Sequence, residues 1–197
     1  MRDRRPGDWV SDLAGRHRLE GEMADALTAH PKLVLARRAT QSLDALDFAV
    51  LGPGEHLAQV ELKAKHQPYQ GWAQLRPDVG ETDLFILDEL ALRRIVDAGR
   101  YAHLVVADLP VGRWCVWSTL DLVLASKVRT VRVLATGAGR VKAKVLLDLR
   151  EAAAVADSPT GAADVVATSL SRCDRLWGAI EPWPGGPVVI DPTRRTS

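Results

Sequence analysis

Residues 44–65 read D-A-L-D-F-A-V-L-G-P-G-E-H-L-A-Q-V-E-L-K-A-K, and this stretch decides the fold class. Two aliphatic segments, 46–51 and 57–64, have the composition of strands. Between them stands Gly52-Pro53-Gly54-Glu55, a run of residues that favour turns. The simplest arrangement of two strands around so short a connection is an antiparallel hairpin.

Helical and strand-like patterns alternate on both sides of this hairpin. Apolar residues recur every four positions over 12–30, which predicts a helix that His30-Pro31 ends. The run 82–87, T-D-L-F-I-L, fits a strand and a helix equally well. Further strands are predicted at 32–38, 102–109 and 113–118, a second hairpin at 127–144, and helices at 88–98 and 161–180. This order predicts an α/β fold with a mixed central sheet flanked by helices.

The hairpin also brings charged residues together. Glu61 and Lys63 lie two apart in one strand and therefore share a face, while Leu62 faces the core. Asp47 begins the neighbouring strand, so pairing places it within a few ångströms of Glu61. Two carboxylates beside an ammonium suit Mg²⁺ or Mn²⁺, with the Leu62 carbonyl as a further ligand and Lys63 acting on the attacking water. Asp44 is the alternative first ligand.

The order helix, strand, hairpin, helix, strand, with Asp47 followed by V-E-L-K-A-K at 60–65, resembles the PD-(D/E)xK nuclease superfamily. The proline of that motif is missing, because Ala45-Leu46 precedes Asp47. Glu20-Gly21-Glu22-Met23 is similar to a first-helix segment of archaeal-type Holliday-junction resolvases, in which the first acid is catalytic. The resemblance implies Glu20 as a further metal ligand and catalytic residue, with Glu22 as the alternate.

The resemblance also implies a restriction-endonuclease-like αβββαβ core over about 12–118. The residue patterns, and not the resemblance, predict a C-terminal basic β-hairpin and helix over about 119–180 and an extended tail over 181–197, all within one domain. The implied activity is metal-dependent hydrolysis of DNA phosphodiester bonds, in junction resolution, restriction or defence, or repair. A homodimer would provide one active site for each strand.

Basic residues concentrate in one segment of a chain whose 26 Lys+Arg nearly balance 25 Asp+Glu. Between positions 127 and 144 stand six cations and no acid, and in the second strand of this hairpin three of them alternate with apolar residues. Such a face is suited to phosphates. The predicted nucleic-acid contacts are Lys65, Arg129, Arg132, Arg140, Lys142 and Lys144. Arg16 and Arg18 are either additional phosphate contacts or only solvated helix residues.

Several alternatives stay open from the sequence. Glu61 and Lys63 also fit a plain surface ion pair on a half-exposed strand. A nucleic-acid-binding or assembly module without turnover fits the same fold. Gln67, Gln70, Gln74 and His66 are each either site residues or ordinary loop residues.

The sequence argues against a membrane protein, a secreted protein, and a protein with a P-loop, serine-hydrolase or zinc motif. Apolar runs are too short to cross a membrane, and the first residues do not form a secretion signal. Cys115 and Cys173 are far apart and fit the core of a protein in a reducing cytoplasm. No P-loop, G-x-S-x-G or zinc-ligand spacing occurs.

Overall fold

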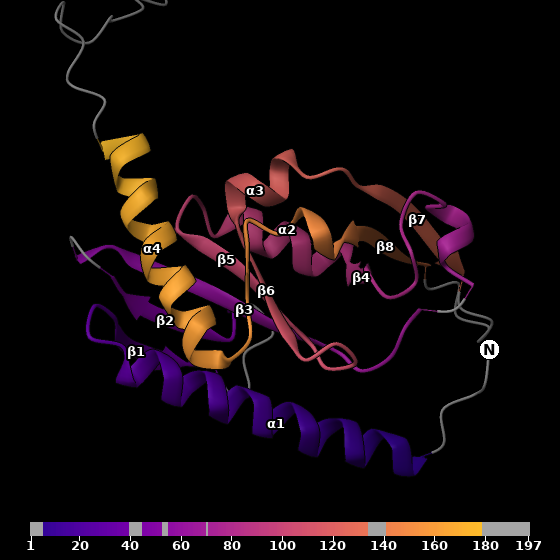
Figure 1. Ribbon diagram of the computed structural model, residues 1–197, viewed down its shortest axis with the longest axis horizontal. Coiled ribbons are helices and arrows are strands. Elements are labelled where there is room, and N and C mark those ends of the chain that lie inside the picture. Colours follow the sequence, from indigo (N-terminus) through magenta and orange to yellow (C-terminus); the bar gives the residue numbers. More distant parts are fainter. Residues whose placement is uncertain (1–5, 40–44, 53–54, 70, 134–140, 179–197) are drawn as a thin grey trace, which may run out of the picture.

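The computed structural model describes residues 6–39, 45–52, 55–69, 71–133 and 141–178 (Figure 1). The helices are α1 (Pro6–Ala29), α2 (Glu89–Asp97), α3 (Thr119–Leu124) and α4 (Pro159–Gly178), with short 3₁₀ turns at Ala73–Leu75 and Leu149–Glu151. The strands are β1 (Val34–Arg38), β2 (Phe48–Leu51), β3 (Leu57–Lys65), β4 (Leu84–Asp88), β5 (Ala102–Asp108), β6 (Arg113–Ser118), β7 (Val128–Val133), β8 (Val141–Asp148) and β9 (Ala154–Ala156).

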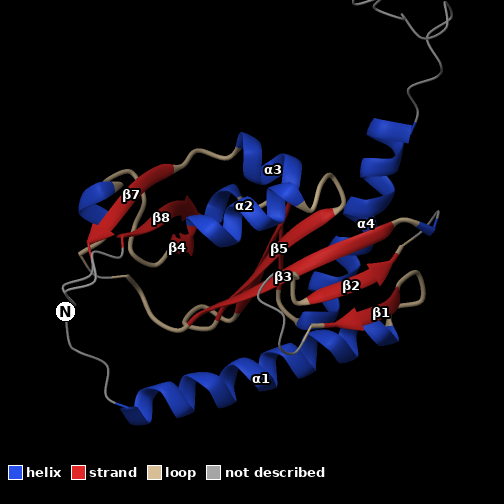
Figure 2. Cartoon of the chain, turned by 180° about the vertical axis from the view of Figure 1, so that it is seen from behind, coloured by secondary structure: helices blue, strands red, loops and turns tan. Residues whose placement is uncertain are grey.

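The main sheet has the strand order β1-β2-β3-β5-β6-β9 within the described part of the chain. β3 and β5 run parallel, and the other neighbours in this sheet run antiparallel. Helices α1 and α4 cover one face, and α2 and α3 lie on the other (Figures 1 and 2). The expected mixed α/β architecture with helices on both faces of a mixed sheet is therefore confirmed.

The central hairpin forms as its sequence predicts. β2 and β3 pair antiparallel, with Phe48 opposite Val60 and Leu51 opposite Leu57. Even-numbered residues of β3, such as Val60 and Leu62, pack against α1 and α4. Odd-numbered residues therefore face the side of α2, and this alternation aims Glu61 away from the α1 and α4 core.

A second, three-stranded sheet has the order β4-β8-β7. The predicted basic hairpin is present as the antiparallel pair β7 and β8. β4 joins β8, so residues 84–88 form a strand rather than a helix. Phe85 and Leu87 pack with Leu104 and Trp117 of the main sheet, and this shared apolar cluster joins the two sheets.

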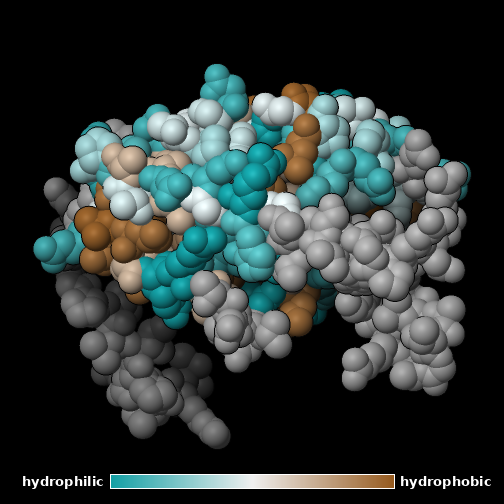
Figure 3. Space-filling model, turned by 90° about the horizontal axis from the view of Figure 1, so that it is seen from below, coloured by the Kyte–Doolittle hydropathy of each residue, from teal (hydrophilic) through white to brown (hydrophobic). Residues whose placement is uncertain are grey.

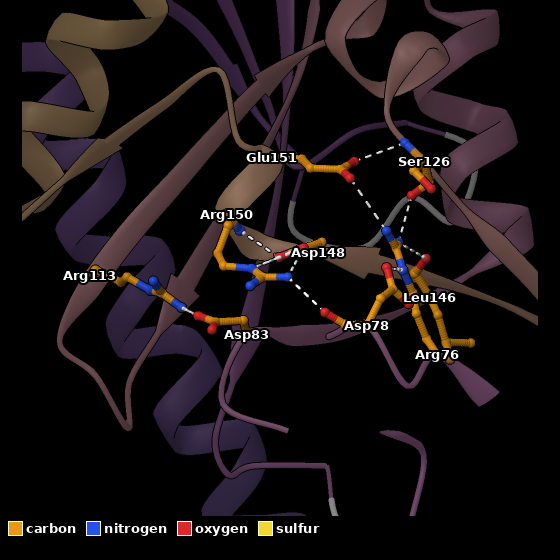
Figure 4. Close-up of polar contacts among 9 residues, drawn as sticks. All are labelled: Arg76, Asp78, Asp83, Arg113, Ser126, Leu146, Asp148, Arg150 and Glu151. Atoms are coloured by element: carbon orange, nitrogen blue, oxygen red, sulfur yellow. Dashed lines mark hydrogen bonds and ion pairs between the residues drawn. The ribbon is translucent and has the colours of Figure 1, made fainter. Parts of the chain in front are cut away.

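A buried arginine network anchors the segment between β3 and β4, which the sequence presents as an ordinary polar loop (Figure 4). Arg76 is almost fully buried and donates to the Ser126 carbonyl at 2.7 Å and to Glu151 at 3.3 Å. Nearby, Arg113 of β6 pairs with Asp83 at 2.7 Å. Buried charges are retained only where such partners satisfy them, so this segment is fixed against both sheets.

Some elements differ from the sequence-based expectation. α3 and β9 were not predicted, because six and three residues are too few for a periodic pattern to show. The Asp88 side chain makes no capping hydrogen bond at the start of α2, although the residue stands at the N-cap. Cys115 is buried as expected, whereas the side chain of Cys173 and the tail 181–197 lie outside the described residues. None of the described helices is long and apolar enough to span a membrane.

Candidate functional site

Asp47 meets the Glu61–Lys63 segment at the point where β2 begins. The hairpin register places Phe48 opposite Val60, so the preceding residue, Asp47, stands beside Glu61. Asp47 Oδ2 accepts a hydrogen bond from the backbone N–H of Leu62 at 2.8 Å. Lys63 Nζ lies 4.0 Å from the same oxygen and forms an ion pair with Glu61 Oε1. The structure thus brings the three residues of the predicted motif together.

Burial changes the chemistry of Asp47. The pKa of its carboxyl is raised, mainly because burial disfavours the charged form and also because Glu61 is nearby. Lys63, the Leu62 N–H and Arg16 act in the opposite direction. A buried carboxylate held among cations is typical of sites that bind a cation or move a proton.

The first helix contributes Glu20 rather than Glu22. Glu20 is buried, and Arg16 donates to its Oε1 at 2.6 Å while also reaching Asp47 Oδ1 at 3.3 Å. Glu22 is more exposed and pairs with Arg18 at 3.3 Å. The Arg16 guanidinium therefore links Glu20 to Asp47, whereas Glu22 belongs to another part of the helix surface.

Four cations surround the three buried acids. Besides Arg16 and Lys63, Arg38 Nη2 lies 3.7 Å from Glu20 Oε2, and Arg94 Nη2 lies 4.0 Å from Glu61 Oε1. All four side chains are partly exposed, from 29% for Lys63 and Arg94 to 57% for Arg16. Four positive charges against three negative charges leave the described site with a net charge of +1, so its acids are balanced by side chains of the protein itself.

Sequence reasoning missed Arg38 and Arg94. Each belongs to an arginine pair, R-R at 37–38 and at 93–94, and no motif in the neighbouring sequence indicates a role in the site. Their contacts with Glu20 and Glu61 come from the packing of β1 against α1 and of α2 against β5, the strand that pairs with β3. Only a prediction of tertiary structure could have found them.

Viewed from the side on which α1 lies, the described surface is mainly hydrophilic, with a hydrophobic patch towards one end (Figure 3). Exposed apolar side chains also cross the hairpin itself. Val34, Leu51 and Leu57 follow one another in register across β1, β2 and β3 and are exposed. The hairpin therefore carries apolar residues at one end and the charged site at the other.

The prediction that Lys65 contacts nucleic acid is wrong. Strand alternation does place Lys65 on the side of Lys63, but its side chain is completely buried. Lys65 Nζ donates to the Thr82 carbonyl and lies 3.7 Å from Asp108 Oδ1 on the paired strand β5. The segment leading into β4 covers this end of β3, so Lys65 is a structural residue.

The described cations of the basic hairpin have partners from other elements. Arg129 pairs with Glu89 at 2.5 Å, and Lys144 pairs with Asp88. Lys127 donates to backbone carbonyls at the end of α3. A count of charges along the sequence misses these acids, because they lie about 40 or more residues away at the start of α2.

Other predicted contacts fall outside the described residues. Arg140 lies there entirely, as do the side chains of Arg132 and Lys142, whose backbones pair directly between β7 and β8. Asp44 and Gln70 also lie outside the described residues. The predicted phosphate contacts at Arg132, Arg140 and Lys142, like those at Arg129 and Lys144, therefore stay predictions.

The histidine and two of the glutamines that follow β3 lie at the surface. His66, Gln67 and Gln74 are exposed. His66 comes close to α1, since a Cβ built on Gly15 would lie 3.9 Å from its Cε1 atom. The His66 ring therefore lies against α1 at Gly15, the residue before Arg16.

The donor atoms of the site are those that hard divalent cations prefer. Asp47, Glu61 and the Leu62 carbonyl supply oxygens from the paired segments of the hairpin, and Glu20 shares the Arg16 guanidinium with Asp47. Within the described residues, no three or more His, Cys, Asp or Glu side chains lie together in an arrangement that could hold a metal ion. The acids are instead held by the four cations. The donor chemistry fits Mg²⁺ or Mn²⁺, and binding would need these cations to rearrange.

Comparisons with known proteins gave no match: no family model, no curated protein and no solved structure is similar to this chain.

Proposed function

We propose that this protein is a metal-dependent nuclease that hydrolyses DNA phosphodiester bonds. The observation that carries the proposal is the meeting of Asp47 with Glu61 and Lys63, in which the Leu62 N–H holds Asp47 at 2.8 Å. These residues come from β3 and from the position directly before β2, and they are buried or half-buried. An accidental E-x-K on a strand surface would not be expected to have a buried acid from the next strand beside it.

The order of elements supports the same proposal. α1, the meander β1-β2-β3, α2 and β5, with β3 and β5 parallel, follow the αβββαβ order of the PD-(D/E)xK superfamily. β4 is inserted between β3 and α2 and pairs in the second sheet. This insertion leaves the parallel pair that positions Glu61 and Lys63 unchanged.

Asp47, Glu61 and the Leu62 carbonyl would hold the metal ion, with Glu20 as a further ligand. A bound Mg²⁺ supplies Lewis-acid stabilisation of phosphoryl oxygens and lowers the pKa of a bound water. The ammonium of Lys63 then orients the attacking water by hydrogen bonding, because its Nζ already lies between Asp47 and Glu61. Arg38 and Arg94 stand at the partly exposed rim, where they can contact phosphate oxygens.

The test is cleavage of labelled linear duplex, four-way junction, flap and single-stranded DNA, and of RNA, with Mg²⁺, with Mn²⁺ and with EDTA. Lys63→Ala should lower the cleavage rate by at least about 10²-fold, the lower range for loss of a group acting on the nucleophile. Lys32→Ala is the matched control, since Lys32 is an exposed lysine before β1. Cleavage that survives in Lys63→Ala, or in EDTA, would contradict the proposal.

A second candidate is a nucleic-acid-binding or assembly module without turnover. The ion pairs that Arg16, Arg38 and Lys63 form with the acids favour it. In a site that binds no metal, the charges of buried acids have to be balanced by such side chains. Such a module should bind DNA with strong salt dependence and without any effect of Mg²⁺ or Mn²⁺. Metal-dependent affinity that Asp47→Asn removes would exclude it.

A further inference from the structure

Arg16 joins two of the buried acids of the site from the solvent side. Its Nε lies 2.6 Å from Glu20 Oε1, and its Nη2 lies 3.3 Å from Asp47 Oδ1. Both nitrogens belong to one planar guanidinium, so the two carboxylate oxygens border the same small space. A single positive group therefore occupies the position between Glu20 and Asp47.

The remaining oxygens of these acids are turned elsewhere. Asp47 Oδ2 accepts from the Leu62 backbone, and Glu20 Oε2 faces Arg38 and His17 at 3.7 and 3.8 Å. Oδ1 of Asp47 and Oε1 of Glu20 are thus the oxygens that Arg16 holds. These are also oxygens that a divalent cation between α1 and β2 would take.

We propose that Arg16 is an exchangeable counter-ion that occupies this cation position and leaves it when a divalent metal ion binds. This inference rests on the proposed function, because it concerns the metal that the nuclease would use. Two carboxylates are balanced by a doubly charged ion alone, so a guanidinium that stayed between them would be repelled by the ion.

Exposure identifies Arg16 as the cation that moves. Its side chain is 57% exposed, against 35% for Arg38 and 29% for both Lys63 and Arg94. A long, largely exposed side chain can turn into water at a small cost, because exposed ion pairs contribute little to stability. The other three cations are more enclosed and remain beside the site.

Removal of this competitor should strengthen metal binding. The expected gain in Mn²⁺ affinity for Arg16→Gln is about 2- to 5-fold, the upper range for an exposed ion pair. Arg18→Gln is the matched control. Arg18 lies on the same helix, is 68% exposed and pairs with Glu22 at the same i,i+4 spacing as Arg16 with Glu20, but its pair stands apart from Asp47.

The experiment titrates Mn²⁺ into the full-length protein and measures free Mn²⁺ by electron paramagnetic resonance, without nucleic acid. Wild type, Arg16→Gln, Arg18→Gln and Asp47→Asn are compared, and circular dichroism confirms that each is folded. Tighter binding in Arg16→Gln alone, with binding reduced in Asp47→Asn, is the expected result. If Arg16→Gln does not fold, Arg16→Lys replaces it, because it keeps the charge and loses the two-nitrogen contact. A smaller gain is then expected.

The outcomes separate this inference from the proposed function. Mn²⁺ binding that Asp47→Asn abolishes but Arg16→Gln leaves unchanged or weakens would overturn the role of Arg16 alone. Absence of Mn²⁺ binding from wild type and from every variant would overturn both. An equal gain in Arg16→Gln and Arg18→Gln would show only a general charge effect, and it would also overturn the exchange.

Discussion

His103 should make the protein less stable as the pH falls below about 6.5. Its ring is completely buried in β5, with Nδ1 3.1 Å from the Tyr101 carbonyl and Nε2 3.0 Å from Ser169 Oγ on α4. Because a carbonyl only accepts, Nδ1 carries the proton of the neutral ring and Nε2 accepts from the serine hydroxyl. Burial lowers the pKa of His103 from 6.5 to about 4.

The sign and size of the effect follow from this shift. Between pH 6.5 and about 4 the unfolded chain binds a proton that the folded protein does not, so the free energy of unfolding decreases as the pH falls. At about 1.4 kcal/mol for each pKa unit, lowering the pKa from 6.5 to about 4 amounts to roughly 3 to 4 kcal/mol. This is a large share of the stability of a typical domain.

Urea unfolding of wild type and His103→Gln, at pH values between 7.5 and 4.5, measures the contribution of His103 to the free energy of unfolding. The other titrating groups are common to both proteins and cancel in the difference between their unfolding free energies. That difference should shift by about 2 kcal/mol in favour of the variant between pH 7.5 and pH 5. Parallel loss of stability in the two proteins over this range would refute the reasoning.

Two further predictions concern buried charges near the hairpin. Lys65→Met should lower the free energy of unfolding by about 3 kcal/mol, because it leaves Asp108 buried with Arg113 as its remaining cation, at 2.8 Å; a urea titration that shows less than about 1 kcal/mol would contradict this. Asp47→Asn should raise stability at neutral pH, because burial raises the pKa of Asp47 and the wild type loses stability as the pH rises through that value. Thermal unfolding should show no advantage of this variant below the ordinary pKa of aspartate, and a constant advantage at all pH values would argue against the titration of Asp47.

Local patterns predicted the part of the site that lies within one hairpin. The strand alternation at 57–64 and the turn residues after position 51 place Asp47 beside Glu61, and the structure has this contact. The E-x-K spacing is enough to put Glu61 and Lys63 on one face. Such contacts depend only on short-range geometry, which sequence reasoning handles well.

Contacts made over long sequence distances were not predictable in this way. Lys65 has the same alternation as Lys63, yet its pairing with Asp108 on β5 buries it. The run of cations at 127–144 does not show that Arg129 and Lys144 are paired, because their acidic partners belong to the start of α2. The link between Arg16 and Asp47 spans 31 positions, and no periodic pattern marks it.

The pairing of β4 with β8 has a consequence for how the chain folds during synthesis. Leu84 lies opposite Asp148, so β4 leaves the ribosome about 64 residues before its partner strand is complete. At ordinary translation rates this interval lasts roughly 3 to 13 s. Throughout it the apolar run Leu84-Phe85-Ile86-Leu87 is an open strand edge, the kind of segment that aggregates or recruits chaperones. Truncation before β8 would make that exposure permanent. The C-terminal third of the chain is therefore needed to cover the strand edge of β4.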